Sequence, residues 1–282
     1  MSLERPRIVA EIGVCWGGDF ELAKRYIEVA AAARVDFVKF QTQIAIEDVP
    51  KSEWDKPRAP PWGGPAIPYI EYKKRMQFTD EQYLEISRHC QSRNIAWSTS
   101  VWGLGALEQI KKFDLPWLKI PSAKLTNQDL LAATAQWAKD NDKKLIVSTG
   151  LSTRDECIEA RKVIDKVGLD HKNLVIFHCN SSYPAKTEEL NLSAIDDLKG
   201  IFQCEIGYSS HSITLGTTVA ATYLGYKWLE VHITHDRSLP GDHSSAVSFH
   251  GIFKVVSGVD DLVKAYGIGQ KCLYDSELSA RL

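Results

Sequence analysis

The feature that most constrains this chain is a regular alternation of short β-rich runs with helical stretches that open on capping signals. Strands that alternate with helices are typical of a parallel sheet whose crossover connections are helical. The predicted strands, about eight in number, are Arg7–Val14, Asp36–Gln41, Ile95–Thr99, Trp117–Pro121, Lys144–Thr149, Leu174–Cys179, Cys204–Tyr208 and Trp228–Thr234.

Helices are predicted between these strands, several of them after capping boxes such as Thr79-x-x-Gln82 and Thr153-x-x-Glu156. Eight βα pairs predict a single (β/α)8 TIM barrel spanning residues 1–282, since such barrels use about 250 residues. A doubly wound open sheet is the alternative, but it usually has fewer strands and often a glycine-rich first turn, which this sequence lacks. The expected helices are Asp19–Arg34, Asp80–Arg93, Gly103–Phe113, Asn127–Asp140, Thr153–Val167, Ser193–Leu198, Leu215–Gly225 and Ile252–Tyr266.

Composition narrows the class of protein. Hydrophobic residues make up 44% of the chain and charged residues 25%, which is ordinary for a soluble globular domain. The formal net charge of -2 offers no general attraction to nucleic acid or to an anionic membrane. The first residues contain no apolar signal segment, and nowhere do 18 apolar residues run together, so we expect a cytoplasmic protein. Its six scattered cysteines are expected to be reduced thiols.

One connection is far longer than an ordinary loop between a strand and a helix. The segment from Ile44 to Phe78 is rich in proline and glycine, yet it also contains Trp54, Trp62, Tyr69 and Tyr72, which give it apolar surface to bury. We interpret it as a lid or substrate-contact segment. A disordered surface insertion is the alternative.

Polar residues recur at alternate positions of several strands. Neighbouring residues of a strand point to opposite faces of the sheet. In the last strand the apolar residues Leu229, Val231 and Ile233 must pack against the helices, so Glu230 and His232 point into the barrel. The same alternation directs Lys39, Lys119 and Glu11 inward. Buried unpaired charges cost several kcal/mol each, so this group requires mutual pairing, a metal or a ligand. Such residues belong at the C-terminal mouth of a barrel.

Two kinds of site follow from these inward residues. Lys39 and Lys119, together with hydroxyl groups at strand ends, predict a site for a small, highly charged anion such as a phosphate ester. His211 follows the seventh predicted strand, and His232 lies in the eighth. Closure of the barrel brings the two together, so their neutral imidazoles can bind one divalent cation and leave some of its coordination positions open. A snorkelling lysine or a core histidine is the alternative for each residue alone. The hydroxyl groups are those of Thr99, Ser122 and Ser148.

Short motifs in a fixed order make the whole chain resemble the sialic acid (N-acetylneuraminate) synthase family. The resemblance lies in their joint order and spacing, because each motif alone is short. The motifs are Ala10-Glu11-Ile12-Gly13, Val38-Lys39-Phe40-Gln41-Thr42, Lys119-Ile120-Pro121-Ser122, Ser148-Thr149-Gly150, His178-Cys179-Asn180-Ser181-Ser182-Tyr183-Pro184, Ile206-Gly207-Tyr208-Ser209-Ser210-His211 and Glu230-Val231-His232.

The resemblance implies an enzyme that condenses phosphoenolpyruvate with the open-chain form of N-acetylmannosamine or a related sugar. It further implies a homodimer and a divalent metal ion, Mn2+ first, with Mg2+ or Co2+ as alternatives. His211 and His232 would bind the metal, and Glu11 or Glu230 would handle a proton. Phosphoenolpyruvate would be held by Lys39, Thr99, Lys119, Ser122, Ser148 and Ser209, and the other substrate contacts would be Ser181, Tyr183 and Asp242.

The sequence also departs from the family pattern. Cys15-Trp16-Gly17-Gly18 replaces an Asn-His-Asn-Gly stretch, which is expected to change the sugar contacts. Many members continue into a C-terminal antifreeze-like domain that contributes an arginine to the partner's sugar site, whereas this sequence ends at Leu282. We therefore expect another sugar, or a contact from segment 44–78 or another protein. The alternative functions are another phosphoenolpyruvate-dependent sugar-acid synthase, for example one that uses a phosphorylated pentose, and a non-catalytic sugar- or metal-binding barrel.

Overall fold

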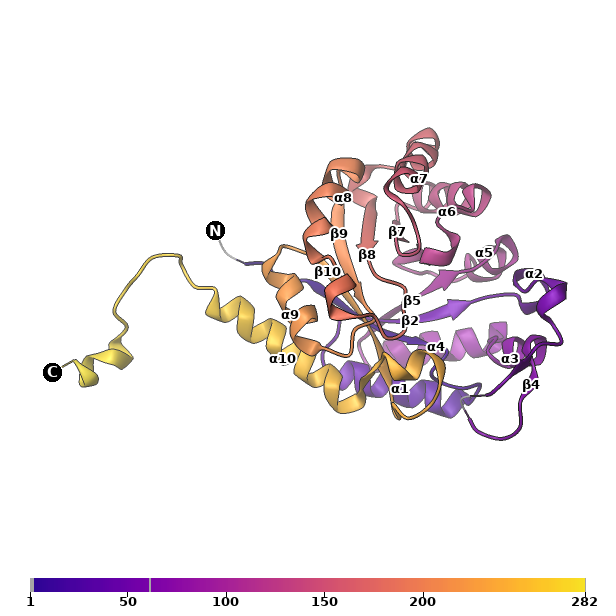
Figure 1. Ribbon diagram of the computed structural model, residues 1–282, viewed down its shortest axis with the longest axis horizontal. Helices are drawn as coiled ribbons and strands as arrows, with labels where there is room; N and C mark the ends of the chain where they lie inside the picture. Colours follow the sequence, from indigo (N-terminus) through magenta and orange to yellow (C-terminus); the bar gives the residue numbers. More distant parts are fainter. Residues whose placement is uncertain (1–2, 61, 282) are drawn as a thin grey trace.

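A closed ring of parallel strands forms the centre of the molecule. The computed structural model describes residues 3–60 and 62–281. The strands follow one another around the ring in chain order, and the last pairs with the first, so the predicted TIM barrel is confirmed (Figure 1). The ring strands are β1 (Arg7–Gly13), β2 (Phe37–Thr42), β5 (Ala96–Val101), β6 (Trp117–Ile120), β7 (Lys144–Ser148), β8 (Leu174–His178), β9 (Glu205–Ser210) and β10 (Trp228–Thr234).

Helices surround this ring, and several begin where the sequence predicts. Both predicted boxes are formed: Thr79 and Gln82 cap α4, and Thr153 and Glu156 cap α7. The predicted helix at Ser193–Leu198 is displaced, because residues 192–194 form a 3-10 turn before α8. The helices are α1 (Phe20–Ala32), α2 (Ala45–Asp48), α3 (Tyr69–Arg75), α4 (Asp80–Ser92), α5 (Leu104–Ile110), α6 (Gln128–Asp140), α7 (Arg154–Val167), α8 (Ile195–Phe202), α9 (Leu215–Tyr223) and α10 (Phe249–Ala265).

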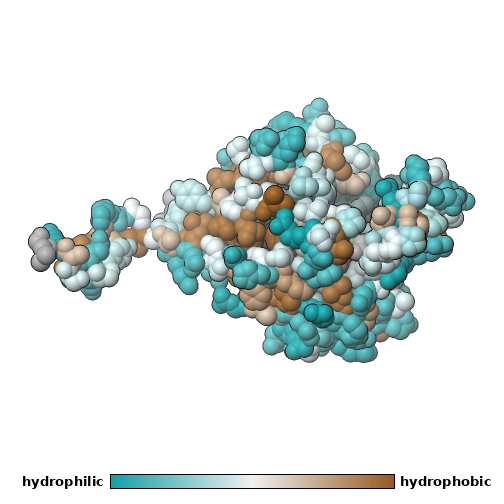
Figure 2. All heavy atoms as spheres, turned by 60° about the horizontal axis from the view of Figure 1, so that its bottom comes forward, coloured by the Kyte–Doolittle hydropathy of each residue, from teal (hydrophilic) through white to brown (hydrophobic). Residues whose placement is uncertain are grey.

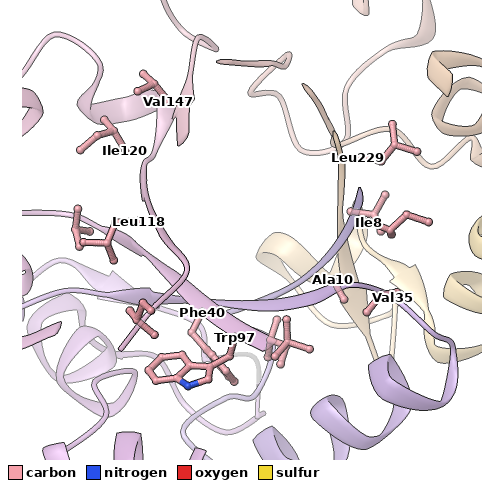
Figure 3. Close-up of a cluster of buried hydrophobic side chains, with 14 of the residues drawn as sticks. Ile8, Ala10, Val35, Phe40, Trp97, Leu118, Ile120, Val147 and Leu229 are labelled. Atoms are coloured by element: carbon pink, nitrogen blue, oxygen red, sulfur yellow. The ribbon is translucent and has the colours of Figure 1, made fainter. Parts of the chain in front are cut away.

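The main hydrophobic core lies between the strands and the helices. Figure 3 shows the apolar side chains of the strands directed away from the barrel axis, among them Ala10, Phe40, Leu118 and Leu229. These are the faces that strand alternation assigns to the helices. The opposite face of each strand is therefore left to fill the barrel interior.

A second, smaller core fills the barrel interior at the N-terminal ends of its strands. It contains four large aromatic side chains, and the ring centroids of Phe37 and Trp228 lie 5.5 Å apart. We call this cluster the aromatic floor. It closes the bottom of the barrel, so the polar residues above it on the same strand faces are accessible from the mouth alone. Its members are Val9, Phe37, Trp117, Ile146, Val175, Phe177 and Trp228.

Residues 44–60 and 62–78 are structured, so the alternative of a disordered insertion does not hold for them. The segment contains α2, a pair of antiparallel two-residue strands, β3 (Pro57–Arg58) and β4 (Ile67–Pro68), and α3. Ile70 is buried against Ala45 and Val49. Figure 1 shows α2, α3 and β4 together at one side of the barrel, beyond the C-terminal end of β2. The segment is thus positioned to contact whatever occupies the mouth.

The last described residues leave the barrel. After α10 the chain runs outward and ends in a short 3-10 helix at Asp275–Ala280 (Figure 1). Figure 2 shows apolar residues along this extension, where Ile268 and Leu278 are exposed. Among residues 3–60 and 62–281, no helix combines the length and the apolar character that crossing a membrane requires.

Candidate active site at the mouth of the barrel

The inward side chains above the aromatic floor line one cavity of about 150 Å³, here called the inner cavity. The residues come from the middle and the C-terminal ends of the ring strands and from the loops that follow them, and barrel enzymes carry their catalytic groups at this end. Eleven of the predicted site residues lie here together: Glu11, Lys39, Lys119, Ser122, Ser148, Ser181, Tyr183, Ser209, His211, Glu230 and His232.

Two lysines and two glutamates form a buried ionic network in the inner cavity. The Lys39 ammonium lies 2.6 Å from Glu11 Oε2 and 3.8 Å from Glu230 Oε2. Lys119 donates to Glu230 Oε1 at 2.5 Å. All four side chains are at least 94% buried, since the most exposed, Lys119, reaches only 6%. The mutual pairing that the sequence requires is therefore present.

The two glutamates have opposite protonation tendencies. Burial raises the pKa of Glu11 to about 7, although Lys39 opposes the shift. Burial also acts on Glu230, but the charges of Lys119 and Lys39 outweigh it and lower the pKa of Glu230 to about 2. Near neutral pH the network therefore favours the ionised form of Glu230, while Glu11 is close to its own pKa. A pKa near the working pH is the property expected of a general acid or base.

Hydroxyl groups complete the wall beside the lysines. Ser122 and Ser181 lie 2.9 Å apart, and Ser209 donates to Glu230 Oε1 at 2.9 Å. Among the described residues, the buried Ser148 Oγ has no hydrogen-bond partner. A buried polar atom without a partner costs about 1–3 kcal/mol, so a ligand oxygen in this position would stabilise the site.

The two predicted metal ligands face each other across the cavity. The ring centroids of His211 and His232 lie 5.2 Å apart. His211 Nδ1 contacts the carbonyl oxygen of Asn180 at 2.5 Å, while its Nε2 lies 2.9 Å from the Tyr183 hydroxyl. Burial lowers the pKa of His211 to about 4 and also lowers that of His232. Both imidazoles are therefore neutral at pH 7, the form that binds metals.

This donor set fits a divalent ion only in part. His232 Nδ1 is buried and lacks a hydrogen-bond partner in the described part of the chain, and Asp242 Oδ2 lies 3.7 Å away. In the same residues, no group of three or more His, Cys, Asp and Glu side chains is arranged to hold a metal ion. Two imidazoles would leave coordination positions for substrate oxygens or water.

A second, outer cavity of about 540 Å³ adjoins the inner one, with Gln41, Trp102 and Tyr183 lining both. Asp242, from the loop after β10, lines the outer cavity, as do Arg58, Tyr69, Tyr72 and Lys73 of segment 44–78. The interpretation of that segment as a substrate-contact element thus agrees with its position. The sequence identified Asp242 only by resemblance, and it did not identify Arg58.

Thr99 lies away from both cavities. Its hydroxyl contacts Thr42 Oγ1 at 2.8 Å, on the helix side of the barrel where Thr42 also meets Tyr83 of α4. The prediction of an inward Thr99 is wrong, because β5 extends to Val101 and its alternation directs Ser98 and Ser100 inward. Lys39 donates to Ser100 Oγ at 2.8 Å. Alternation from the outward Trp97 would have revealed this.

Comparison with known proteins agrees with this geometry. The model of the NeuB family matches residues 26–271, most of the chain. The chain belongs to the NeuB family. One relative is the N,N'-diacetyllegionaminic acid synthase of Campylobacter jejuni. It is 30% identical over 98% of this chain and 81% of that protein. The human N-acetylneuraminate-9-phosphate synthase is 29% identical, over 96% of this NeuB chain and 74% of its own length.

A solved structure extends the similarity to three dimensions. The N-acetylneuraminic acid (sialic acid) synthetase of Leptospira borgpetersenii, in complex with citrate, superposes on this NeuB chain with a TM-score of 0.81 at 28% identity. The match covers 99% of this chain and 90% of that one. The fold and the family thus agree with the resemblance carried by the short motifs.

Proposed function

We propose that this NeuB-family barrel condenses phosphoenolpyruvate with an amino-sugar aldehyde to give a nonulosonic (sialic-type) acid and inorganic phosphate. The enol carbon of phosphoenolpyruvate forms a bond to the aldehyde carbon. Water adds to the carbon that bears the phosphate, and cleavage of the C–O bond releases phosphate and leaves a 2-oxo acid. The buried network of Lys39, Lys119, Glu11 and Glu230 in a mouth cavity is the observation that carries this proposal.

Phosphoenolpyruvate is small and multiply negative, which matches the charges of the inner cavity. Each lysine contributes roughly 4 kcal/mol of Coulomb attraction at 4 Å and an effective dielectric of 20, before desolvation is subtracted. Only Glu230 opposes Lys39 and Lys119 firmly, because Glu11 is partly protonated at neutral pH. Hydroxyl donors for the ligand oxygens are those of Ser122, Ser148, Ser181 and Ser209, with Ser100 in addition.

The proposed reaction also uses a divalent metal ion, with Mn2+ as the first choice and Mg2+ or Co2+ as alternatives. His211 and His232 would hold it, with Asp242 nearby, and the ion would polarise the aldehyde oxygen of the acceptor. The Tyr183 hydroxyl donates to His211 Nε2, because Nδ1–H of the neutral ring donates to the carbonyl oxygen of Asn180, and Tyr183 would have to release Nε2 when metal binds. Phosphate release measured with and without acceptor and metal tests the function. Release that needs neither, or none with any N-acetylated or diacetamido hexose, would reject it.

Lys119→Ala is expected to weaken phosphoenolpyruvate binding by on the order of 10- to 100-fold, the value of one charge-assisted hydrogen bond. In this variant Glu230 still has two partners, the Ser209 hydroxyl at 2.9 Å and the Lys39 ammonium at 3.8 Å. The fold should therefore persist. Calorimetric titration with phosphoenolpyruvate measures the effect, and circular dichroism checks the fold. Lys166→Ala, on the exposed surface of α7, is the control. Unchanged affinity in Lys119→Ala would remove this lysine from the substrate site.

Glu11→Gln is expected to flatten the pH dependence of the reaction. As a base, Glu11 must be ionised, so kcat/KM should rise with pH through about 7 in the parent enzyme. The variant should lose roughly 10²–10⁴-fold in rate, the usual contribution of a general base, and should lack this inflection. The pH profile of phosphate release provides the measurement, with the exposed Glu188→Gln as control. A variant that retains the inflection would assign it to another group.

We also propose a cytoplasmic homodimer. The dimer is supported by apolar side chains exposed on α9, on α10 and in the extension after it, among them Tyr223, Phe253, Tyr266 and Ile268. Light scattering at several protein concentrations measures the oligomeric state. A monomer at every concentration would contradict the dimer.

A further inference from the structure

Trp102 occupies the junction between the two cavities. It follows strand β5 directly, and it lines both the inner and the outer cavity, as Gln41 and Tyr183 do. Its backbone N–H donates to the carbonyl oxygen of Thr42, at the end of β2, over 3.1 Å. The ammonium group of Lys73, from α3, lies 5.4 Å from the centroid of the indole ring. The residue is thus held from two sides, by the barrel and by α3.

The indole N–H of Trp102 is an unused donor. Among the described residues, Trp102 Nε1 is buried and has no hydrogen-bond partner. An indole nitrogen can only donate, so the atom that pairs with it must be an acceptor. A buried donor without a partner destabilises the structure, because it has lost its hydrogen bonds to water. A ligand oxygen at the junction would therefore gain a contact that the described residues do not make among themselves.

The other side chains of the junction complement this donor. Gln41 Nε2 donates to Glu11 Oε1 at 3.0 Å, so the side-chain carbonyl oxygen of Gln41 is the atom left to accept. The indole ring and the ring of Tyr183 provide apolar surface. The junction thus combines one donor, one acceptor and two aromatic rings. An acetamido group has the matching parts: a carbonyl oxygen, an N–H and a methyl group.

The position of the junction selects the part of the acceptor that lies there. The aldehyde carbon must reach the inner cavity, where Lys39, Lys119 and the two histidines lie. The inner cavity has a volume of about 150 Å³ and the outer one about 540 Å³, so the rest of the sugar extends outward. The carbon next to the aldehyde, with its substituent, is then at the junction.

We propose that Trp102 determines acceptor specificity by donating its indole N–H to the carbonyl oxygen of an acetamido group on the carbon next to the aldehyde. This inference rests on the proposed condensation, because it concerns the second substrate of the same site. A hydroxyl oxygen lies one bond from that carbon, whereas the carbonyl oxygen lies three bonds away and reaches further toward the wall. A site that pairs its buried donor with one substrate rejects the analogue that leaves the donor unpaired.

Trp102→Phe isolates the donor, because it removes the indole N–H and keeps an aromatic ring beside Lys73. Two acceptors are compared in the presence of phosphoenolpyruvate and Mn2+, and the 2-oxo acid product is quantified. One is the N-acetylated hexose with the highest turnover, N-acetylmannosamine in the first instance. The other has a hydroxyl group in place of the acetamido group, which for N-acetylmannosamine is mannose. The parent enzyme should prefer the acetamido sugar by on the order of 10- to 100-fold in kcat/KM.

Trp102→Phe should lose about tenfold of this preference, mainly through KM, because the contact forms with the substrate and the transition state alike. Its calorimetric affinity for phosphoenolpyruvate should equal that of the parent, which also shows that the variant is folded. Trp137→Phe, a matched change at a half-buried position of α6, should behave as the parent enzyme in both measurements.

Nuclear magnetic resonance of the indole N–H gives a second measurement, which needs no turnover. In protein with isotopically labelled tryptophan, the Trp102 resonance is the one that is missing from the spectrum of Trp102→Phe. Phosphoenolpyruvate is present and the metal is left out, so the acceptor binds without reacting. The acetamido sugar should move the indole proton resonance downfield, since a new hydrogen bond forms, and the hydroxyl analogue should leave it in place.

The outcomes separate the two proposals. A parent enzyme that uses the hydroxyl analogue as well as the acetamido sugar would overturn the role of Trp102 and leave the condensation intact. An unchanged preference in Trp102→Phe, an equal loss in Trp137→Phe, or a Trp102 resonance that does not respond to the acetamido sugar would each do the same. Condensation with none of the N-acetylated and diacetamido hexoses would overturn the proposed function, and the specificity assignment with it.

Discussion

Glu230→Ala should lose about 3–5 kcal/mol of unfolding free energy, the usual effect of removing one partner from a buried ionic network. Glu230 accepts from Lys119 and Ser209 through one oxygen, and its other oxygen faces Lys39 at 3.8 Å. Without this carboxylate the two buried lysines repel each other, and condensation should fall by several orders of magnitude. Urea unfolding and phosphate release measure the two effects.

The stability difference should also depend on pH with a defined sign. The folded-state pKa of Glu230, about 2, lies below its ordinary value of 4.5, so its ionised form stabilises the fold at neutral pH. That contribution declines as pH falls from about 4.5 toward 2, and the gap between the parent protein and Glu230→Ala should narrow there. Glu188→Ala, an exposed change, should alter neither stability nor its pH profile. A gap that stays constant with pH would show that Glu230 is not ionised in the folded protein.

Removal of divalent ions should abolish condensation, and readdition of Mn2+ should restore it. The expected loss is at least about 10³-fold, because a bound ion stabilises charge on the acceptor oxygen by several kcal/mol. His232→Ala and His211→Ala should reproduce the loss, and added Mn2+ should not rescue them at concentrations that rescue the parent. Calorimetric titration with Mn2+ gives a second measurement that is independent of turnover. Full activity after exhaustive chelation would contradict the metal assignment.

Strand alternation was sufficient to predict much of the site. Lys39, Lys119, Glu230 and His232 lie on the inward faces because each is flanked by apolar residues that need the helices. Thr99 was misassigned because it was taken as the end of its strand, whereas β5 runs two residues further and alternation from Trp97 turns Thr99 toward the helices. Short hydroxyl side chains fit either face of a strand.

Other parts of the site have no local signal in the sequence. Arg58 reaches the outer cavity through a hairpin inside a proline-rich segment, which has no period from which to infer direction. The opposite pKa shifts of Glu11 and Glu230 depend on distances to Lys39 and Lys119 that only the closed ring establishes. The motifs could therefore identify the residues but not their protonation.

The aromatic floor has a consequence for the order of events in catalysis. Because the bottom of the barrel is filled by Phe37, Trp117 and their neighbours, everything that enters must use one opening. The inner cavity lies deeper than the outer one, and the two meet at Gln41, Trp102 and Tyr183. In the proposed reaction, phosphoenolpyruvate must therefore arrive before the sugar that would block its route. Steady-state kinetics should accordingly reveal a compulsory sequence of addition.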